Sequence, residues 1–349
     1  RVDIEPLPEY ISALDAVTPD AIRIHPESEN VYLIQPTLKG EPARDVIETS
    51  YCTAEGSFYA TRECHLSIEG DAMNGYWDVD GNMVIQCKTQ SVYWNLMAVS
   101  AAVGMEMSKV RIIENHTGAS FGWAASPGSY AIMGACLMEI KDRPLNLTMT
   151  YDEFMHFSGK RAPLYTNARM ACDKDGKLTA LEFDALSDRG PYTEFAGHNL
   201  EKVMRFMGWP YHIPNVTGLG KATFTNAIFG TAYRGFGATQ SYTTSETLMD
   251  MLAEKMGMDP LEFRYINVAR PGDLNLNSYP FKEYPMEEML NRMRPLYQAA
   301  LAKAKAESTD QVKHGVGIVM GGFNNTLSTH DHAEFALELN PNGSVTNFN

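Results

Sequence analysis

The sequence has few cysteines, and their spacing excludes several kinds of metal and disulfide site. Five cysteines are scattered through 349 residues, and none of them forms a Cys-x-x-Cys pair. A disulfide scaffold, a zinc ribbon and a local iron–sulfur motif all need more closely spaced or more numerous cysteines. We therefore expect isolated, buried thiols.

Long apolar runs and an excess of positive charge are also missing. No apolar stretch approaches the length of a membrane-spanning helix. The formal net charge of -14 at pH 7 disfavours a general nucleic-acid or membrane surface, because both of these partners are themselves anionic. An anionic ligand must therefore be bound by local donors rather than by the field of the whole protein.

The two ends of the sequence lack the usual marks of a complete chain. The sequence starts with Arg1 rather than methionine, shows no signal peptide, and stops soon after an Asn-Gly pair at 342–343. We therefore expect a piece of a longer polypeptide, which exposes apolar surface and is not stable as an isolated monomer.

The sequence does contain a mixture of strand and helix signals. Asp-Gly or Asn-Gly pairs at 80–81, 175–176 and 342–343 stand between apolar runs, a pattern that predicts tight hairpins. Predicted helices lie between these hairpins. The combination indicates an α+β fold with mixed sheets and packed helices.

Three helices have clear boundaries in the sequence. Residues 91–104 are apolar on nearly all sides and predict a buried helix. Residues 245–257 predict an amphipathic helix, and Asp259 is placed to cap the next one. Residues 285–308 predict a long helix with a break or bend near Pro295.

Two loops stand out because each places small residues before a predicted helix. In HTGASFGW, Gly118, Ala119, Ser120 and Gly122 would let backbone N–H groups approach a bulky anion, although the loop matches neither the phosphate-loop nor the Rossmann glycine pattern. In TAYRGFGATQ, Arg234 adds a permanent cation that can hold an anion at two points.

Two interpretations of these loops stay open. The pair could clamp one large anionic cofactor. Alternatively, the small residues of the first loop serve tight packing, and Arg234 forms a buried ion pair with a local acid such as Glu246.

Other candidate residues are less specific. HDHAEF places His330 and His332 on one face of a predicted strand, but no third zinc ligand is identifiable. His65 and Glu69 have i, i+4 spacing, which favours a hydrogen-bonded structural pair over catalysis. No Gly-x-Ser-x-Gly or His-Glu-x-x-His motif is present.

A longer pattern surrounds the second loop. TAYRGFGATQ, with MLAEKMGMDPLEFRYINVARPGD after it, resembles the large subunit of the molybdenum hydroxylases, the family of xanthine oxidase and the aldehyde oxidoreductases. FSGKRAPLYTNARMACDKDGKLTALEFDALSDRGPYTEF runs parallel to the same family, so that the resemblance spans essentially the whole chain. Within the family it resembles bacterial aldehyde oxidoreductases that use molybdopterin cytosine dinucleotide.

The resemblance implies a middle segment of the family's catalytic chain. Residues 1–282 resemble the later part of the first molybdopterin-binding domain, and residues 283–349 resemble the incomplete start of the second. The stretch 269–285, rich in Pro, Gly and Asn, is the expected linker. The implied partners are the iron–sulfur domains or subunits and the remainder of the second molybdenum-binding domain.

The resemblance also implies which residues form the site. The expected cofactor contacts are Gly118, Ala119, Ser120, Phe121, Gly122, Ala232, Tyr233, Arg234, Gly235 and Phe236. The expected lining of the substrate funnel is Trp123, Ala125, Phe195 and Phe236. The implied cofactor is molybdopterin cytosine dinucleotide with molybdenum, or with tungsten, and no side chain of this chain is expected to ligate the metal directly.

The implied function is that of one component of a molybdenum-dependent aldehyde oxidoreductase. The family oxidises an aldehyde to a carboxylic acid with water as the oxygen source, and the electrons pass to 2Fe-2S clusters on other segments or chains. The family's base, a glutamate, corresponds to a position beyond Asn349, so we expect no catalytic residue here and no activity from this chain alone.

Two alternatives remain. The chain could belong to an N-heterocycle hydroxylase of the same family, although Ala125 stands where the purine-oxidising branch has a glutamate. It could also be a cofactor-free structural or assembly subunit. In each case we expect a soluble protein of the bacterial cytoplasm or periplasm.

Overall fold

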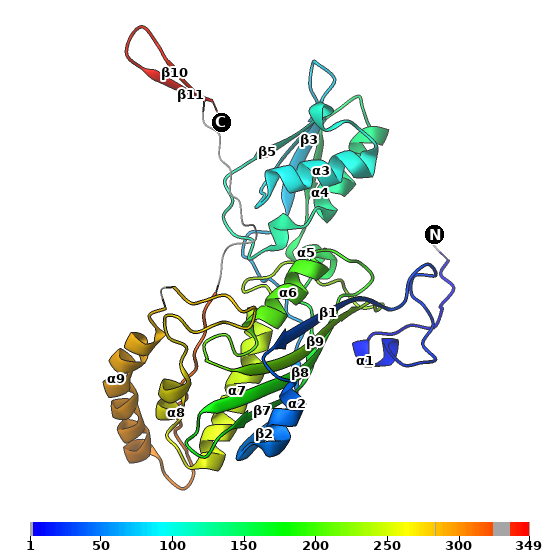
Figure 1. The fold of residues 1–349 in the computed structure, drawn as a ribbon. Helices are drawn as coiled ribbons and strands as arrows, with labels where there is room; N and C mark the ends of the chain where they lie inside the picture. Colours follow the sequence, from blue (N-terminus) through cyan, green and yellow to red (C-terminus); the bar gives the residue numbers. More distant parts are fainter. Residues whose placement is uncertain (1–2, 283, 324–335, 349) are drawn as a thin grey trace.

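The chain folds into two lobes, which Figure 1 shows one above the other. The structure is a computed structural model that describes residues 3–282, 284–323 and 336–348. In this part of the chain, strands and helices alternate in two separate mixed sheets, which confirms the predicted α+β class.

The large lobe is built on a five-stranded sheet. Its strands follow the order β1 (Val31–Lys39), β9 (Asn215–Thr223), β8 (Leu178–Asp188), β7 (Leu164–Cys172) and β2 (Cys52–Ala60). All neighbours are antiparallel except β8 and β9, which are parallel. Helices α6 (Ala196–Phe206) and α7 (Ala238–Met256) cover one face, and the short helix α2 (Ala43–Thr49) covers part of the other.

The small lobe has a four-stranded sheet. Its order is β5 (Val110–Glu114), β4 (Met83–Cys87), β3 (Ala72–Trp77) and β6 (Leu145–Thr148). Helices α3 (Val92–Val103) and α4 (Gly128–Glu139) share one apolar core with this sheet. Two short 3-10 helices, η1 (Met107–Lys109) and η2 (Trp123–Ala125), complete the lobe.

The remaining elements surround the large lobe or connect the two lobes. They are α1 (Ala13–Ala16), α5 (Tyr151–Phe157), α8 (Pro260–Asn267) and α9 (Met286–Glu307). The hairpin of β10 (Ala336–Leu339) with β11 (Val345–Phe348) comes last in the chain. Residues 269–285, the expected linker, connect α8 to α9.

The small lobe is an insertion between two paired strands of the large lobe. β2 and β7 are antiparallel neighbours, yet the whole small lobe lies between them in the sequence. The chain therefore leaves the large lobe after Ala60 and returns before Leu164. The outgoing and returning segments pair once, at Glu63 and Arg161, so both run through the junction of the lobes (Figure 1).

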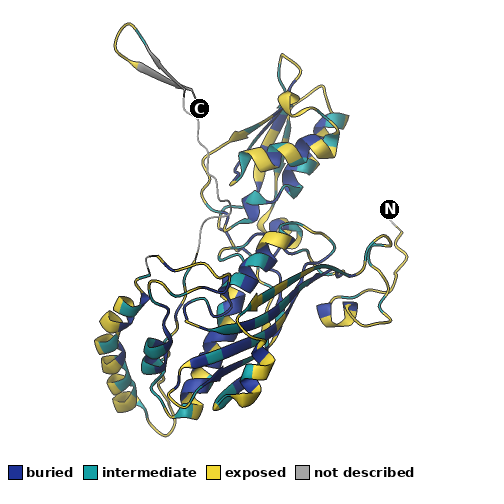
Figure 2. Ribbon diagram, viewed as in Figure 1, coloured by how far each residue is buried: buried dark blue, intermediate teal, exposed yellow. Residues whose placement is uncertain are grey.

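The main core lies between the five-stranded sheet and its covering helices, where Figure 2 shows the sheet and α7 mostly in dark blue. Leu181 and Phe183 of β8 pack there with Leu200 of α6 and Leu248 of α7. Between Leu181 and Ala185 of β8, buried and more exposed side chains alternate, as the period of two residues in a strand requires. The core thus fixes the starts of α6 and α7, which lie beside the junction.

Local turn and cap chemistry confirms the predicted turns and the predicted end of α7, although α7 begins at Ala238, well before the predicted start at 245. The glycines of all three predicted hairpins, Gly81, Gly176 and Gly343, have positive φ angles between adjacent strands. Gly257 ends α7 in the left-handed conformation, and the Asp259 side chain accepts hydrogen bonds from the first turn of α8.

Two helix predictions were wrong in part. α3 is not buried on all sides, because it packs on the four-stranded sheet with one face only; Tyr93 is 79% exposed and Trp94 is 42% exposed. α9 has no break, since it runs as one helix through Pro295. Pro295 removes only one backbone donor from the helix. The helix continues because the buried Tyr297, in the next turn, packs against the core.

The prediction of isolated, buried thiols was also wrong in part. All five cysteines are free, but Cys136 is exposed, and Cys52 and Cys64 are partly buried. Cys52 lies directly opposite the buried Cys172 in the pairing of β2 with β7. Burial raises the pKa of the Cys172 thiol to about 12, which keeps it protonated.

We predict that one buried ion pair contributes strongly to the stability of the large lobe. Arg264 is fully buried, and its Nε donates to Glu246 Oε2 at 3.0 Å, while Tyr211 donates to the same carboxylate at 2.7 Å. Arg264→Met would leave the Glu246 charge without its cation and should lower the free energy of unfolding by about 3–5 kcal/mol.

The matched control is Arg292→Met, because Arg292 forms an exposed pair with Glu288 on α9. This change should alter the free energy of unfolding by less than about 1 kcal/mol. Urea unfolding followed by circular dichroism measures both variants. Equal effects of the two substitutions would contradict the role of the buried pair.

Candidate functional site

The two candidate loops meet at the junction of the lobes. The Arg234 N–H of the second loop donates to the Phe121 carbonyl of the first at 2.9 Å. Gly122 has a φ of +116°, and a Cβ at this position would lie 2.5 Å from the Ala232 carbonyl oxygen. Only glycine permits this backbone approach, so Gly122 is required for the contact.

Both loops present unpaired donors. The Arg234 side chain is exposed and makes no hydrogen bond or ion pair within the described residues. In the same part of the chain, the N–H groups of Phe121, Gly122 and Gly235 have no hydrogen-bond acceptor. The predicted alternative, an ion pair between Arg234 and Glu246, is not formed.

The reason is that Glu246 is already engaged elsewhere. It is buried on α7, where it pairs with Arg264 of α8 and accepts a hydrogen bond from Met320 N at 2.9 Å. Arg234 therefore remains available to a ligand, because the acid suggested as its partner is used inside the large lobe.

Three phenylalanines at the junction have strained backbones. Phe121, Phe195 and Phe236 have φ angles of 55°, 50° and 45°, in the left-handed region. A residue with a Cβ loses about 1–2 kcal/mol in this conformation, so the surrounding contacts must impose it. Such residues concentrate at functional sites.

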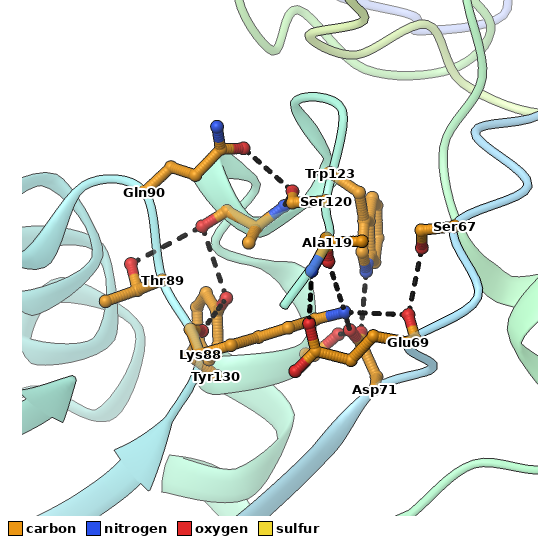
Figure 3. A network of polar contacts seen from close by, with 12 residues as sticks. Ser67, Glu69, Asp71, Lys88, Thr89, Gln90, Ala119, Ser120, Trp123 and Tyr130 are labelled. Carbon is orange, nitrogen blue, oxygen red and sulfur yellow. Dashed lines mark hydrogen bonds and ion pairs between the residues drawn. The ribbon is translucent and has the colours of Figure 1, made fainter. Parts of the chain in front are cut away.

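A buried polar network supports the first loop from below (Figure 3). The Ala119 N–H donates to Glu69 Oε2 at 2.5 Å, and Lys88 Nζ donates to the Ala119 carbonyl at 3.3 Å. Lys88 also pairs with Asp71 at 3.5 Å, and Asp71 accepts the indole N–H of Trp123 at 2.6 Å. These contacts fix the loop on the small lobe.

Ser120 adds a second anchor for the first loop. Its hydroxyl donates to Gln90 Oε1 at 2.7 Å and accepts from Ala124 N at 2.6 Å. Ser120 is buried, whereas Gly118 and Phe121 are exposed and Ala119 is partly buried. The loop thus has a buried side with hydrogen-bonding partners and an open side.

The second loop is held by two side chains from the segments that connect the lobes. His65 Nε2 donates to the Ala232 carbonyl at 2.7 Å. Arg161 donates to the Arg234 carbonyl at 2.8 Å, and its guanidinium lies 4.0 Å from the centroid of the Tyr233 ring. Both contacts orient the backbone that carries Arg234.

The predicted pairing of His65 with Glu69 was wrong. Residues 64–70 do not form a helix, so the i, i+4 spacing does not place the two side chains on one face. Instead, each side chain binds a different candidate loop. No local pattern indicates these roles, because both partners are far away along the chain.

Glu194 was also missed by the sequence analysis. Its carboxylate accepts a hydrogen bond from Ser126 in the small lobe at 3.0 Å and another from the Thr231 hydroxyl in the large lobe. Burial raises the pKa of Glu194. The side chain therefore joins the lobes directly behind the two loops.

The residues expected to line the substrate side do not share one environment. The rings of Phe195 and Phe236 meet edge to face, with their centroids 5.9 Å apart, and Ala125 is partly buried on η2. Trp123, in contrast, is only 2% exposed and packs against Phe154. Its position supports the first loop from inside the small lobe.

The described residues contain neither a cluster of metal-ligating side chains nor a membrane-spanning helix. Among the described residues, no group of three or more His, Cys, Asp or Glu side chains could hold a metal ion. Within the same ranges, no helix combines the length and the apolar character needed to cross a membrane. His330 and His332 lie outside the described residues.

We predict a measurable pH dependence from His65. Burial, partly offset by the hydrogen bond to Ala232, lowers the pKa of His65 from 6.5 to about 4. Between these values the unfolded chain binds a proton that the folded chain does not, so stability falls as the pH falls. The full effect below pH 4 is about 3 kcal/mol.

Comparing the wild type with His65→Gln isolates the contribution of His65 to the pH dependence of stability. This variant should show a smaller loss of unfolding free energy between pH 6.5 and 4 than the wild type. His198→Gln, at an exposed position, serves as the control and should follow the wild type. Parallel pH profiles for wild type and His65→Gln would refute the assignment.

Comparison with known proteins identifies the family. The model of the molybdopterin cofactor-binding domain matches residues 24–268. Aldehyde oxidoreductase from Megalodesulfovibrio gigas is 42% identical over 346 residues, which cover 99% of this chain and 38% of that protein. This chain thus spans well under half of the relative's length.

Solved structures agree with this match. The aldehyde oxidoreductase from Desulfovibrio gigas superposes with a TM-score of 0.96 at 42% identity, over 99% of this chain and 38% of that one. The enzyme from Desulfovibrio desulfuricans superposes with a TM-score of 0.95 at 38% identity, over the same shares. The chain therefore belongs to the molybdopterin cofactor-binding domains of the xanthine oxidase family of molybdenum hydroxylases.

Proposed function

We propose that this chain supplies one side of the cofactor and substrate site of a molybdenum-dependent aldehyde oxidoreductase. The observation that carries the proposal is the unpaired Arg234 beside the unpaired amides of Phe121, Gly122 and Gly235, at a junction of two lobes. Ligand sites commonly lie at such junctions. The similarity to aldehyde oxidoreductases supports the choice of activity.

The donors at the junction fit a large anionic cofactor. A guanidinium and backbone N–H groups are the groups that bind phosphate oxygens, and Gly122 and Gly235 leave room for close approach. We infer that Arg234 and the two loops hold molybdopterin cytosine dinucleotide, with molybdenum or tungsten. When bound, this group supplies the redox chemistry that oxidises the aldehyde with water as the oxygen source.

The residues of this chain would hold and orient the reactants. Glu69 and Lys88 fix the first loop, and His65 and Arg161 fix the second, so the donors are placed before any ligand arrives. Such preorganisation reduces the entropy lost on binding. Their role is therefore one of positioning.

The substrate side is apolar. Phe195 and Phe236 would form part of a wall, and Ala125 leaves space beside it without offering a charge. This composition favours bulky or aromatic aldehydes over an N-heterocycle that needs a polar partner. We place Trp123 behind this wall, because it is buried.

The rest of the enzyme would complete the site. We propose that residues 1–282 belong to the first molybdopterin-binding domain and residues 283–349 to the second. The base glutamate and the 2Fe-2S clusters would come from parts of the enzyme outside this sequence. They would receive the proton and the electrons of the reaction, respectively.

The direct test uses the purified intact enzyme that contains this chain. We expect it to contain molybdenum or tungsten, to release a cytosine nucleotide on denaturation, and to convert benzaldehyde to benzoate with oxygen from labelled water. Absence of metal and nucleotide would favour a cofactor-free subunit. Turnover of hypoxanthine without turnover of benzaldehyde would favour the N-heterocycle hydroxylase.

A second prediction concerns Arg234 alone. Arg234→Ala should weaken cofactor retention about tenfold or more, because it removes charge-assisted hydrogen bonds. Arg234→Lys should have an intermediate effect, since it keeps the charge but loses the fork of donors. The measurement is the molar ratio of metal to protein after gel filtration.

The control is Arg143→Ala, at an exposed arginine of the small lobe that pairs with Asp142. This variant should retain the metal content of the wild type. Because Arg234 is exposed and has no described protein partner, its replacement should leave the unfolding temperature nearly unchanged. Unchanged metal content in Arg234→Ala would rule out its proposed role.

A further inference from the structure

A third aromatic side chain extends the pair of phenylalanines across the junction. Trp94 lies in the first turn of α3 in the small lobe, and its ring centroid is 5.9 Å from that of Phe195 in the large lobe. Phe195 in turn lies 5.9 Å from Phe236. The three rings therefore form one row that begins on one lobe and ends on the other.

The position of Trp94 is fixed by the backbone beside it. The Gln90 N–H donates to the Ala124 carbonyl at 3.1 Å, and the side-chain amide of Asn95 donates to the same oxygen at 3.3 Å. Asn95 is fully buried. The start of α3 is thus hydrogen-bonded to η2, which carries Ala125, so these contacts set the position of Trp94 relative to the small residue at 125.

The exposure of Trp94 also requires an explanation. Trp94 is 42% exposed, although the whole helix was expected to be buried. It is neither a core residue like Trp123 nor a side chain without contacts, because it touches Phe195. A partly exposed indole next to a phenylalanine ring offers a flat apolar surface to a ligand.

We infer that Trp94 is the outer member of an aromatic wall that selects aromatic over small aliphatic substrates. The inference rests on the proposed function, because it assigns a substrate class to the same site. The left-handed backbone of Phe195 holds the middle ring of the row. An aromatic ring would enter past Trp94 and then contact Phe195 and Phe236, with space provided at Ala125.

The kinetic test compares benzaldehyde with acetaldehyde in the intact enzyme. Trp94→Ala should lower kcat/KM for benzaldehyde about fivefold, mainly through KM, since an aromatic pair contributes modestly beyond burial. For acetaldehyde the value should change less than about twofold, because its small apolar group buries little area. Trp94→Phe should retain most of the preference.

The matched control is Tyr93→Ala. Tyr93 is the preceding residue of the same helix, is 79% exposed, and has no aromatic contact among the described residues. Its replacement should leave the ratio of the two kcat/KM values unchanged. An unchanged ratio in Trp94→Ala, or an equal shift in Tyr93→Ala, would overturn the inference.

A binding measurement separates this inference from the proposed function. The chain has four tryptophans, so the difference in fluorescence between wild type and Trp94→Phe reports Trp94. Titration with benzoate, which is not oxidised, should change this difference signal saturably, and acetate should not. If the enzyme does not oxidise aldehydes but the signal still saturates with benzoate, the aromatic site at Trp94 stands and the proposed activity is wrong. If benzoate causes no change in the signal, the aromatic site at Trp94 is wrong.

Discussion

The close approach of Gly122 to Ala232 is the contact on which the site depends. The small lobe is inserted into the large lobe through two connecting segments, so its orientation has to be fixed by contacts at the junction. There the first loop reaches the second with no room for a Cβ, and the Arg234 N–H bonds across the gap. A side chain at position 122 would separate the loops and disperse the donors.

Buried cations make this irregular junction possible in an acidic protein. Loops carry carbonyl groups that no sheet or helix satisfies, and burying them without donors is unfavourable. Lys88 donates to the Ala119 carbonyl of the first loop, Arg161 to one carbonyl of the second loop, and Arg189 to the Gly230 carbonyl just before it. Because these cations already serve the backbone, Arg234 is left free to face a ligand.

The sequence predicted what depends on neighbours along the chain. Turn glycines, the Asp259 cap and the two small-residue loops were recognised because their chemistry is local. His65 and Glu194 were not recognised as loop supports, because their partners Ala232 and Ser126 are 167 and 68 residues away. The exposed face of α3 was missed for a related reason. When a helix is apolar on nearly all sides, its sequence does not determine which side packs against the sheet.

The cofactor side and the substrate side of the junction need opposite kinds of surface, and the same two loops provide both. A bound anion needs donors that protein acceptors have not used, whereas an apolar substrate needs rings held without any polar partner nearby. The strained backbones of Phe121 and Phe236 serve both, since each loop turns at its phenylalanine and exposes adjacent N–H groups. Charge recognition and shape recognition therefore depend on the same few φ angles, and a change that relaxes this strain should weaken both together.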